Sequence, residues 1–215
     1  MHGKKSKLKV IDLFAGVGGI SSGFEKVGFD VVSANEYKQE IANTYTKNHP
    51  GTKIIIEDIT KVKSKDLLNG EKEIDVIVGG PPCQGFSMAG RRIRGGEGAF
   101  LNDPRNELFK EFIRVVKEIK PKVFVMENVA AMLNIHGGAV RDEIIESFRK
   151  IGYETKVHVL LAAEYGVPQM RKRAVFIGNR IGVDPENFFP EKTHGTKNGK
   201  PYVTVAETIL DLPKV

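Results

Sequence analysis

The 215-residue sequence is 40% hydrophobic and 28% charged, which is the balance of an ordinary globular protein with one full core. Its apolar runs are shorter than the ~20 residues of a membrane-crossing helix, no signal peptide is recognisable, and its single cysteine excludes an internal disulfide and is consistent with a reducing cytoplasm. The formal net charge of +6 modestly favours a polyanionic partner, although a lysine-rich solvated surface explains it equally well.

Strand-like and helix-like segments alternate along the chain. The apolar segments expected to form strands are 8–14, 29–35, 53–57, 75–78, 122–126, 153–162 and 173–179. The segments with helical patterns are 20–27, 38–48, 106–119 and 140–151. Because β-α-β units with short connections repeat, we expect an α/β fold with a doubly wound, mostly parallel sheet and helices on both faces. We expect residues 1–215 to form a single domain.

Chemically useful residues follow the expected strands directly. They are Gly16, Gly18, Glu36, Asp58, Cys83 and Glu127. The carboxyl ends of parallel strands meet at one edge of a sheet, and open α/β sheets bind their ligands there. One site at this edge can therefore gather all six residues.

The first expected strand runs into a glycine-rich turn, Ala15–Gly19, whose backbone can approach a ligand closely. A dinucleotide fingerprint would place a third glycine at position 21, where the chain has Ser21, so a nicotinamide or flavin enzyme is disfavoured. Glu36 suits a ribose diol and Asp58 suits an adenine amino group, although each acid alone is also typical of a helix cap or a solvated loop. Together they predict an adenosine-containing cofactor.

The only cysteine, Cys83, lies in the segment Gly79–Ser87, where two glycines and two prolines force the backbone out of the preceding strand. A lone cysteine is ordinarily a small buried apolar residue. Here the rigid turn and the polar neighbours Gln84 and Ser87 favour a reactive thiol at the end of a strand.

Two further patterns contain charged residues. Glu127 ends an apolar strand, so we expect partial burial, a raised pKa and a protonated carboxyl that can donate a hydrogen bond; the alternative is a carboxylate bound by backbone amides. Arg171 and Arg173 are two residues apart in an extended segment and project to one side of it. They are candidates for contact with an anion or a base, although such stretches are usually solvated.

The segment Gly79–Ser87 resembles the nucleophile motif of the cytosine-C5 DNA methyltransferases. Further segments resemble motifs of the same family in the same order, and they are Asp12–Gly19, Asp103–Phe109, Glu127–Val129 and Gln169–Arg173. The resemblance extends from Val10 to about Pro213. It implies a Rossmann-like fold that binds S-adenosylmethionine.

The resemblance also implies which residues bind the cofactor. They are Asp12, Phe14, Ala15, Gly16, Val17, Gly18, Gly19, Glu36, Tyr37, Asp58, Ile59, Pro81 and Leu108. Among them, Glu36 would hold the ribose hydroxyls, while Asp58 and Ile59 would flank the adenine. No metal site is expected.

The implied mechanism gives each catalytic residue a task. The Cys83 thiolate would add to C6 of cytosine, and protonated Glu127 would bind N3 and the exocyclic amine. Arg173 would contact the base O2, and Arg171 would support the loop or a phosphate. Because a base inside a duplex cannot reach such a pocket, the cytosine would have to be flipped out.

A glycine-rich and arginine-rich stretch, 87–102, follows the nucleophile motif. We expect a lid that closes on DNA, with Ser87, Arg91, Arg92 and Arg94 meeting phosphates. The alternative is an ordinary surface loop.

The chain departs from the family after the arginine motif, because the target-recognition region and the last family motifs have no counterpart in it. We therefore expect either the catalytic subunit of a split enzyme, completed by a second polypeptide, or a truncated chain. In both cases we expect weak or no activity from this chain alone.

The sequence therefore predicts a cytoplasmic, nucleoid-associated enzyme that methylates duplex DNA in a restriction–modification system. The first alternative is a cytosine-C5 methyltransferase that acts on tRNA. The second is a regulatory paralogue without chemistry, which the presence of Cys83, Glu127, Arg171 and Arg173 disfavours.

Overall fold

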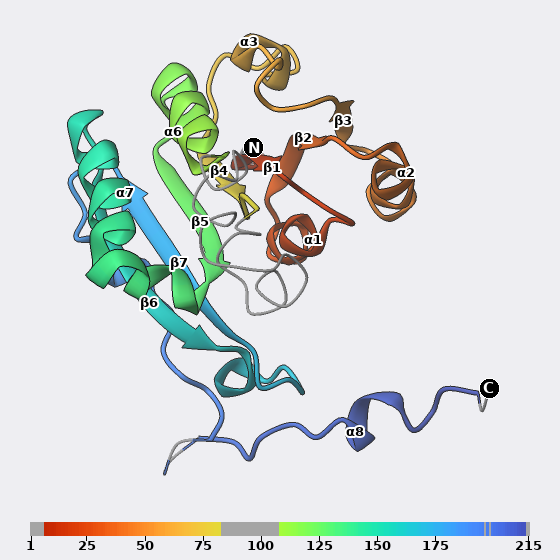
Figure 1. Ribbon diagram of the computed structural model, residues 1–215. Helices are drawn as coiled ribbons and strands as arrows, with labels where there is room; N and C mark the ends of the chain where they lie inside the picture. The colour runs from red at the N-terminus through yellow and green to blue at the C-terminus, as the bar shows by residue number, and fades with distance from the viewer. Residues whose placement is uncertain (1–6, 83–107, 196, 198, 214–215) are drawn as a thin grey trace, which may run out of the picture.

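The computed structural model describes residues 7–82, 108–195, 197 and 199–213. Seven strands form one sheet in the order β3-β2-β1-β4-β5-β7-β6 (Figure 1). Their bounds are β1 Lys9–Leu13, β2 Asp30–Glu36, β3 Lys53–Ile56, β4 Val76–Gly79, β5 Val123–Val129, β6 Glu154–Leu161 and β7 Lys172–Asn179. The strands β1 to β5 pair in parallel, and β7 runs antiparallel to both of its neighbours. The predicted fold, an α/β fold with a mostly parallel sheet, is confirmed.

Helices cover both faces of this sheet. The α-helices are α1 Gly19–Lys26, α2 Gln39–Asn48, α3 Ser64–Leu67, α6 Leu108–Ile119, α7 Ala139–Lys150 and α8 Ala206–Ile209. The short 3-10 helices are η2 Ala130–Gly138, η3 Ala162–Tyr165 and η4 Pro185–Phe188. Figure 1 shows α1 and α2 on one side of the sheet and α6 and α7 on the other. The strand and helix patterns of the sequence were therefore interpreted correctly for the longer elements, whereas the short helices were missed.

The alternation of side chains along each strand divides the core into two layers. In β1, Ile11 points to the larger apolar cluster, which contains Phe112 of α6, while Val10 points to the smaller cluster with Phe24 of α1. The larger cluster is centred on Phe124, whose ring stacks on Phe148 at a centroid distance of 3.7 Å. The sheet is thus fixed from both sides, and its strand ends form a rigid edge.

The reversal of β7 was not predicted in the sequence analysis. The connection between β6 and β7 spans residues 162–171 and holds only the short helix η3. A parallel crossover ordinarily needs a dozen or more residues and a longer helix, so a hairpin is the connection that this length permits. As a result, the start of β7 lies at the same edge as the carboxyl ends of the parallel strands.

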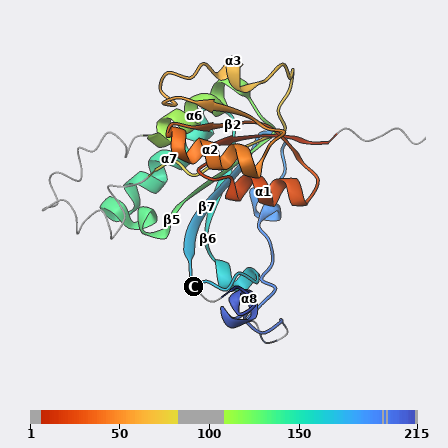
Figure 2. The ribbon, with the colours of Figure 1, turned by 90° about the vertical axis from the view of Figure 1, so that its right-hand side faces the viewer.

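The last described segment lies away from the sheet. Both views place α8 beyond the end of the sheet that carries β6 and β7 (Figure 1, Figure 2). The apolar side chains of this last segment are largely exposed, and Leu210 and Leu212, which follow α8, are 81% and 62% exposed. None of the helices in the described ranges has the length and apolar character needed to cross a membrane.

Candidate active site

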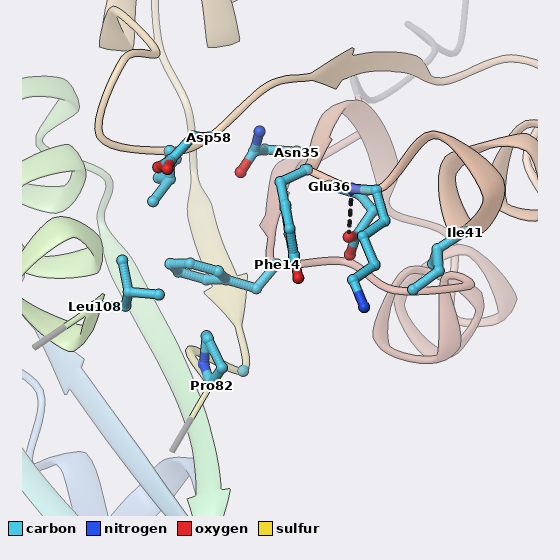
Figure 3. A pocket seen from close by; sticks show the side chains of 11 residues that line it. Phe14, Asn35, Glu36, Ile41, Asp58, Pro82 and Leu108 are labelled. Atoms are coloured by element: carbon cyan, nitrogen blue, oxygen red, sulfur yellow. Dashed lines mark hydrogen bonds between the residues drawn. The ribbon is translucent and has the colours of Figure 1, made fainter. Parts of the chain in front are cut away.

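A pocket of about 410 Å³ opens at the carboxyl edge of β1, β2, β3 and β4 (Figure 3). Its lining combines apolar walls with two carboxylates, and it consists of Phe14, Asn35, Glu36, Tyr37, Lys38, Ile41, Asp58, Ile59, Gly80, Pro82 and Leu108. These residues come from segments far apart in the sequence, which the sheet order brings together.

The glycine-rich turn leaves β1 in an unusual backbone conformation. Gly16 and Gly18 have φ angles of 59° and 92°, in the left-handed region that glycine adopts without cost. Phe14 has a φ of 56°, which is uncommon for a residue with a side chain and marks a strained position beside the pocket. The sequence therefore turns sharply here, and the backbone of the turn borders the cavity.

Glu36 is held by the backbone on two sides. Its Oε2 accepts a hydrogen bond from the Gly16 N–H at 3.1 Å. Its Oε1 accepts one from the Lys38 N–H at 3.0 Å, which is the dashed line in Figure 3. The residue is 7% exposed and lies at the end of β2. These two bonds fix the carboxylate at the pocket wall before any ligand binds.

A second acid lies across the pocket. Asp58 Oδ1 accepts hydrogen bonds from the N–H of Thr60 at 2.9 Å and from its hydroxyl at 2.8 Å. These bonds hold the pKa of Asp58 below its usual value, so the group is a carboxylate at neutral pH. Asn35 supports this segment from below, because its amide donates to the carbonyls of Ile55 and Glu57.

A buried polar chain lies behind the turn. Asp12 Oδ2 accepts a hydrogen bond from the Ser21 hydroxyl at 2.6 Å, and that hydroxyl also contacts the Tyr45 hydroxyl at 2.8 Å. Complete burial raises the pKa of Asp12 from 3.8 to about 7, against the opposing effect of the Ser21 hydrogen bond. The other oxygen, Oδ1, has no hydrogen-bond partner in the described part of the chain. Asp12 is therefore a group beneath the turn and does not line the cavity.

The turn that leads to Cys83 is tied to the end of β5. The Asn128 amide donates to the Pro81 carbonyl at 3.0 Å, while its Oδ1 accepts from the Val129 N–H at 2.8 Å. Asn128 is 4% exposed, so these bonds are shielded from water. They place the chain just before Cys83 next to Glu127.

Glu127 and the two arginines meet at this point. Arg173 Nε lies 2.6 Å from Glu127 Oε1, and Arg171 Nη2 lies 3.7 Å from the same oxygen. The antiparallel register explains the closeness, because Arg173 pairs with Val129 and is diagonal to Glu127 on one face of the sheet. The expectation that Glu127 carries a proton remains a prediction.

The pocket brings together six of the residues predicted to bind a cofactor, namely Phe14, Glu36, Tyr37, Asp58, Ile59 and Leu108. The turn residues Ala15, Gly16, Val17, Gly18 and Gly19 do not line the pocket, although the Gly16 N–H binds the lining residue Glu36, and Pro82 lines it where Pro81 was predicted. Cys83, Ser87, Arg91, Arg92 and Arg94 lie outside the described residues. Four further lining residues were not predicted from the sequence, namely Asn35, Lys38, Ile41 and Gly80, although the first two flank the predicted pair Glu36 and Tyr37.

The chemistry of the pocket fits an adenosine-type cofactor. A fixed carboxylate at the end of the second strand of the chain suits a ribose diol, and a second carboxylate suits an exocyclic amine. Between the two carboxylates, the side chains of Phe14, Ile59 and Leu108 offer an apolar surface for a base.

A model of the family of C-5 cytosine-specific DNA methylases matches residues 8–214. The Type II methyltransferase M1.HphI of Haemophilus parahaemolyticus is 45% identical over 97% of this chain and 54% of its own length. The Type II methyltransferase M.AquIA of Picosynechococcus is 41% identical over 95% of this chain and 89% of its own length. A crystal structure assigned as a prophage-encoded DNA modification methyltransferase of E. coli superimposes with a TM-score of 0.77 at 32% identity, over 97% of this chain and 56% of that one. The chain thus spans about half the length of two of these relatives and most of the third.

Proposed function

The chain belongs to the C-5 cytosine-specific DNA methylase family, and we propose that it is the catalytic part of an S-adenosylmethionine-dependent DNA cytosine-C5 methyltransferase of a restriction–modification system. One observation supports this proposal most directly. The pocket with Glu36 and Asp58, the Glu127–Arg173 pair and the turn that enters Cys83 share one edge of the sheet.

S-adenosylmethionine, when bound, supplies an electrophilic methyl group. Glu36 accepts hydrogen bonds from the ribose hydroxyls, and Asp58 accepts one from the adenine amine. The apolar walls exclude water from the base. Asp12 contributes indirectly, because its chain through Ser21 supports the turn from behind.

The remaining residues activate a flipped cytosine. The Cys83 thiolate forms a bond to C6, and the electron pair displaced from the C5–C6 double bond makes C5 nucleophilic. Glu127 donates a hydrogen bond to N3, and Arg173 donates one to O2, so that the electron-rich ring is stabilised. Methyl transfer to C5 would break the bond between the methyl carbon and the sulfonium sulfur and leave S-adenosylhomocysteine. Loss of the C5 proton to solvent would then restore the double bond and expel the Cys83 thiolate. Arg171 supports the connection 162–171 that leads into β7, or contacts a phosphate.

We include duplex DNA and a second polypeptide in the proposal. Two features support a protein partner. The apolar side chains of the last segment are exposed, including Val205 at 54% and Leu210 at 81%, and α8 lies away from the sheet (Figure 1). M.AquIA, moreover, is a curated relative that this chain matches over 89% of its length. Phosphate contacts by Ser87, Arg91, Arg92 and Arg94, and a location at the nucleoid in the cytoplasm, remain predictions.

The test is transfer of labelled methyl from S-adenosylmethionine to duplex DNA and to tRNA. The chain is assayed alone and with any companion polypeptide from its source, as wild type, Cys83→Ser, Glu127→Gln and Glu146→Gln, the last being a partly exposed glutamate of α7 that pairs with Arg149. We expect DNA to be methylated with the companion present, and both active-site variants to be inactive while Glu146→Gln is unaffected. Methylation of tRNA but not of duplex DNA would show that the substrate is RNA. Transfer that survives Cys83→Ser would refute the covalent mechanism, and no transfer under any condition would favour a regulatory role.

A further inference from the structure

His49 lies directly behind the glycine-rich turn, although its position in the sequence indicates only the end of a helix. It follows α2 (Gln39–Asn48) and is 2% exposed. Its Nε2 lies 3.1 Å from the carbonyl oxygen of Gly18, and its Nδ1 lies 2.8 Å from Oε2 of Glu25 in α1. The ring therefore connects the end of α2 with the turn and with the helix that follows the turn.

The fit between His49 and Gly18 is close. A Cβ built on Gly18 would overlap the imidazole ring of His49 and would approach Cδ2 of Tyr45 to 3.1 Å. The imidazole also packs on the Tyr45 ring at a centroid distance of 4.5 Å. The space behind Gly18 is thus filled by the histidine, and only a glycine leaves room for it.

The residue before His49 binds the carbonyl of the residue before Gly18. Asn48 donates its side-chain amide to the Val17 carbonyl at 2.9 Å. Two consecutive carbonyls of the turn are therefore held by two consecutive residues at the end of α2. The Gly18 carbonyl also accepts the first intrahelical hydrogen bond of α1, from the Ser22 N–H at 2.9 Å, so Ser22 and His49 hold it together. Because a trans peptide directs its N–H opposite to its C=O, this carbonyl directs the Gly19 N–H toward the free N-terminal end of α1.

Both partners of the imidazole are acceptors. Gly18 offers a carbonyl oxygen, and Glu25 offers a carboxylate whose side chain is 39% exposed. The ring nitrogens are the donors available to these two acceptors. The Ser22 hydroxyl, at 3.5 Å from Nε2, is too distant to replace either bond.

We propose that His49 is a positioning residue of the cofactor site, and that as a brace between Glu25 and the Gly18 carbonyl it holds the glycine-rich turn in its binding conformation. The inference rests on the proposed function for the identity of the ligand, S-adenosylmethionine. The brace itself is a property of this chain and is measurable without any ligand.

The test uses three substitutions of His49. His49→Phe keeps the stacking on Tyr45 and removes both donors. His49→Gln places an amide near the position of Nε2 and can still donate to the Gly18 carbonyl, whereas His49→Asn places its amide near Nδ1 and reaches only Glu25. Thr46→Ala, on an exposed position of α2, is the control.

The first readout is hydrogen exchange of the amides of residues 15–19 without cofactor, together with the unfolding midpoint. We expect His49→Phe and His49→Asn to accelerate this exchange about tenfold, the effect of one lost hydrogen bond, with His49→Gln close to wild type. The second readout is the calorimetric Kd for S-adenosylmethionine, which we expect to weaken about tenfold in the same two variants.

Unchanged exchange of the turn in His49→Phe, or equal behaviour of His49→Gln and His49→Asn, would overturn the proposal. If His49→Phe does not fold, the comparison between His49→Gln and His49→Asn decides the question. Faster exchange in the variants without any binding of S-adenosylmethionine by the wild type would leave the brace established and refute the proposed cofactor.

Discussion

The carboxylate of Glu36 accepts a hydrogen bond from the backbone N–H of Gly16, 20 residues earlier in the chain. This contact joins the glycine-rich turn after β1 to the end of β2, so the two halves of the cofactor pocket are assembled before a ligand arrives. The preorganised carboxylate need not be ordered during binding, which lowers the entropic cost of association.

Glu36→Gln should weaken binding of S-adenosylmethionine by tenfold or more, because an amide offers one acceptor oxygen where the carboxylate offers two charged ones. Stability should fall by about 1 kcal/mol, since one of the two backbone N–H bonds is lost. Calorimetric titration measures the first effect and urea unfolding the second. Glu40→Gln, in the first turn of α2, is the matched control. Equal affinity of the two variants would show that Glu36 does not contact the cofactor.

Asn128→Ala should separate catalysis from cofactor binding. The amide that holds the Pro81 carbonyl is lost, so the turn entering Cys83 is no longer tied to β5. We expect methyl transfer to fall more than tenfold, as misplacement by about 1 Å costs a catalytic site heavily, while the Kd for S-adenosylmethionine stays within about twofold, less than the loss of one hydrogen bond would cause. Single-turnover transfer and calorimetry test the two parts. An equally large loss of affinity for S-adenosylmethionine would show that Asn128 supports the whole carboxyl edge of the sheet and not the turn alone.

Arg173→Lys should impair methyl transfer more than Arg171→Lys. Only Arg173 approaches Glu127 closely, at 2.6 Å, and it is the more buried of the two arginines. A lysine cannot reproduce the planar, multiply donating guanidinium beside the carboxylate. Rates of transfer to duplex DNA at saturating cofactor compare the two variants. A larger effect at Arg171 would reverse the assignment of these two residues.

Gly79→Ala should destabilise the protein by about 3 kcal/mol, because an added methyl group would overlap the backbone carbonyl of Leu13 in the neighbouring strand. Backbone in the middle of a sheet cannot move aside as a flexible side chain can. Gly51→Ala, where no atom lies within 4 Å of the added carbon, should change stability by less than about 0.5 kcal/mol. Urea unfolding of both variants gives the comparison, and similar stabilities would contradict the packing of β1 against β4.

The stability of the protein should depend on pH through Asp12. Its folded-state pKa, about 7, lies above the value of about 3.9 of an exposed aspartate, so between these values the folded state keeps a proton that the unfolded chain releases. The free energy of unfolding should therefore fall as pH rises from about 4 to about 7, by at most about 1.4 kcal/mol per pH unit from this group, and then level off. Asp12→Asn should remove this slope. A pH-independent difference between wild type and variant would show that Asp12 does not titrate in this range.

The longer elements could be predicted because each has a strong local pattern. In α6, the buried residues Phe109, Phe112, Val115 and Val116 recur at helical spacing, and glycines with positive φ flank α1 on both sides. Glu36 and Asp58 could be predicted because parallel topology alone carries strand ends to a common edge. The short helices α3 and α8 have too few residues to produce a period, so no pattern marked them.

The remaining parts of the site depend on contacts that sequence order does not reveal. His49 and Asn48 act on residues 31 positions earlier, and a histidine before a proline ordinarily indicates only that a helix ends. Arg173 and Glu127 lie close together because β7 runs antiparallel to β5. The sequence indicates this reversal only through the connection 162–171, which is too short for a parallel crossover with a helix.

The reversed strand also makes the proposed catalytic geometry sensitive to strand register. In the parallel part of the sheet, a residue gained or lost in a loop after a strand changes that loop alone. A residue gained or lost in β7 between Arg173 and Val175 would instead carry Arg173 to the opposite face of the sheet, away from Glu127, while the rest of the strand could keep its pairing. Insertion scanning along this chain should therefore find positions in β7 at which the folded protein survives and the chemistry does not.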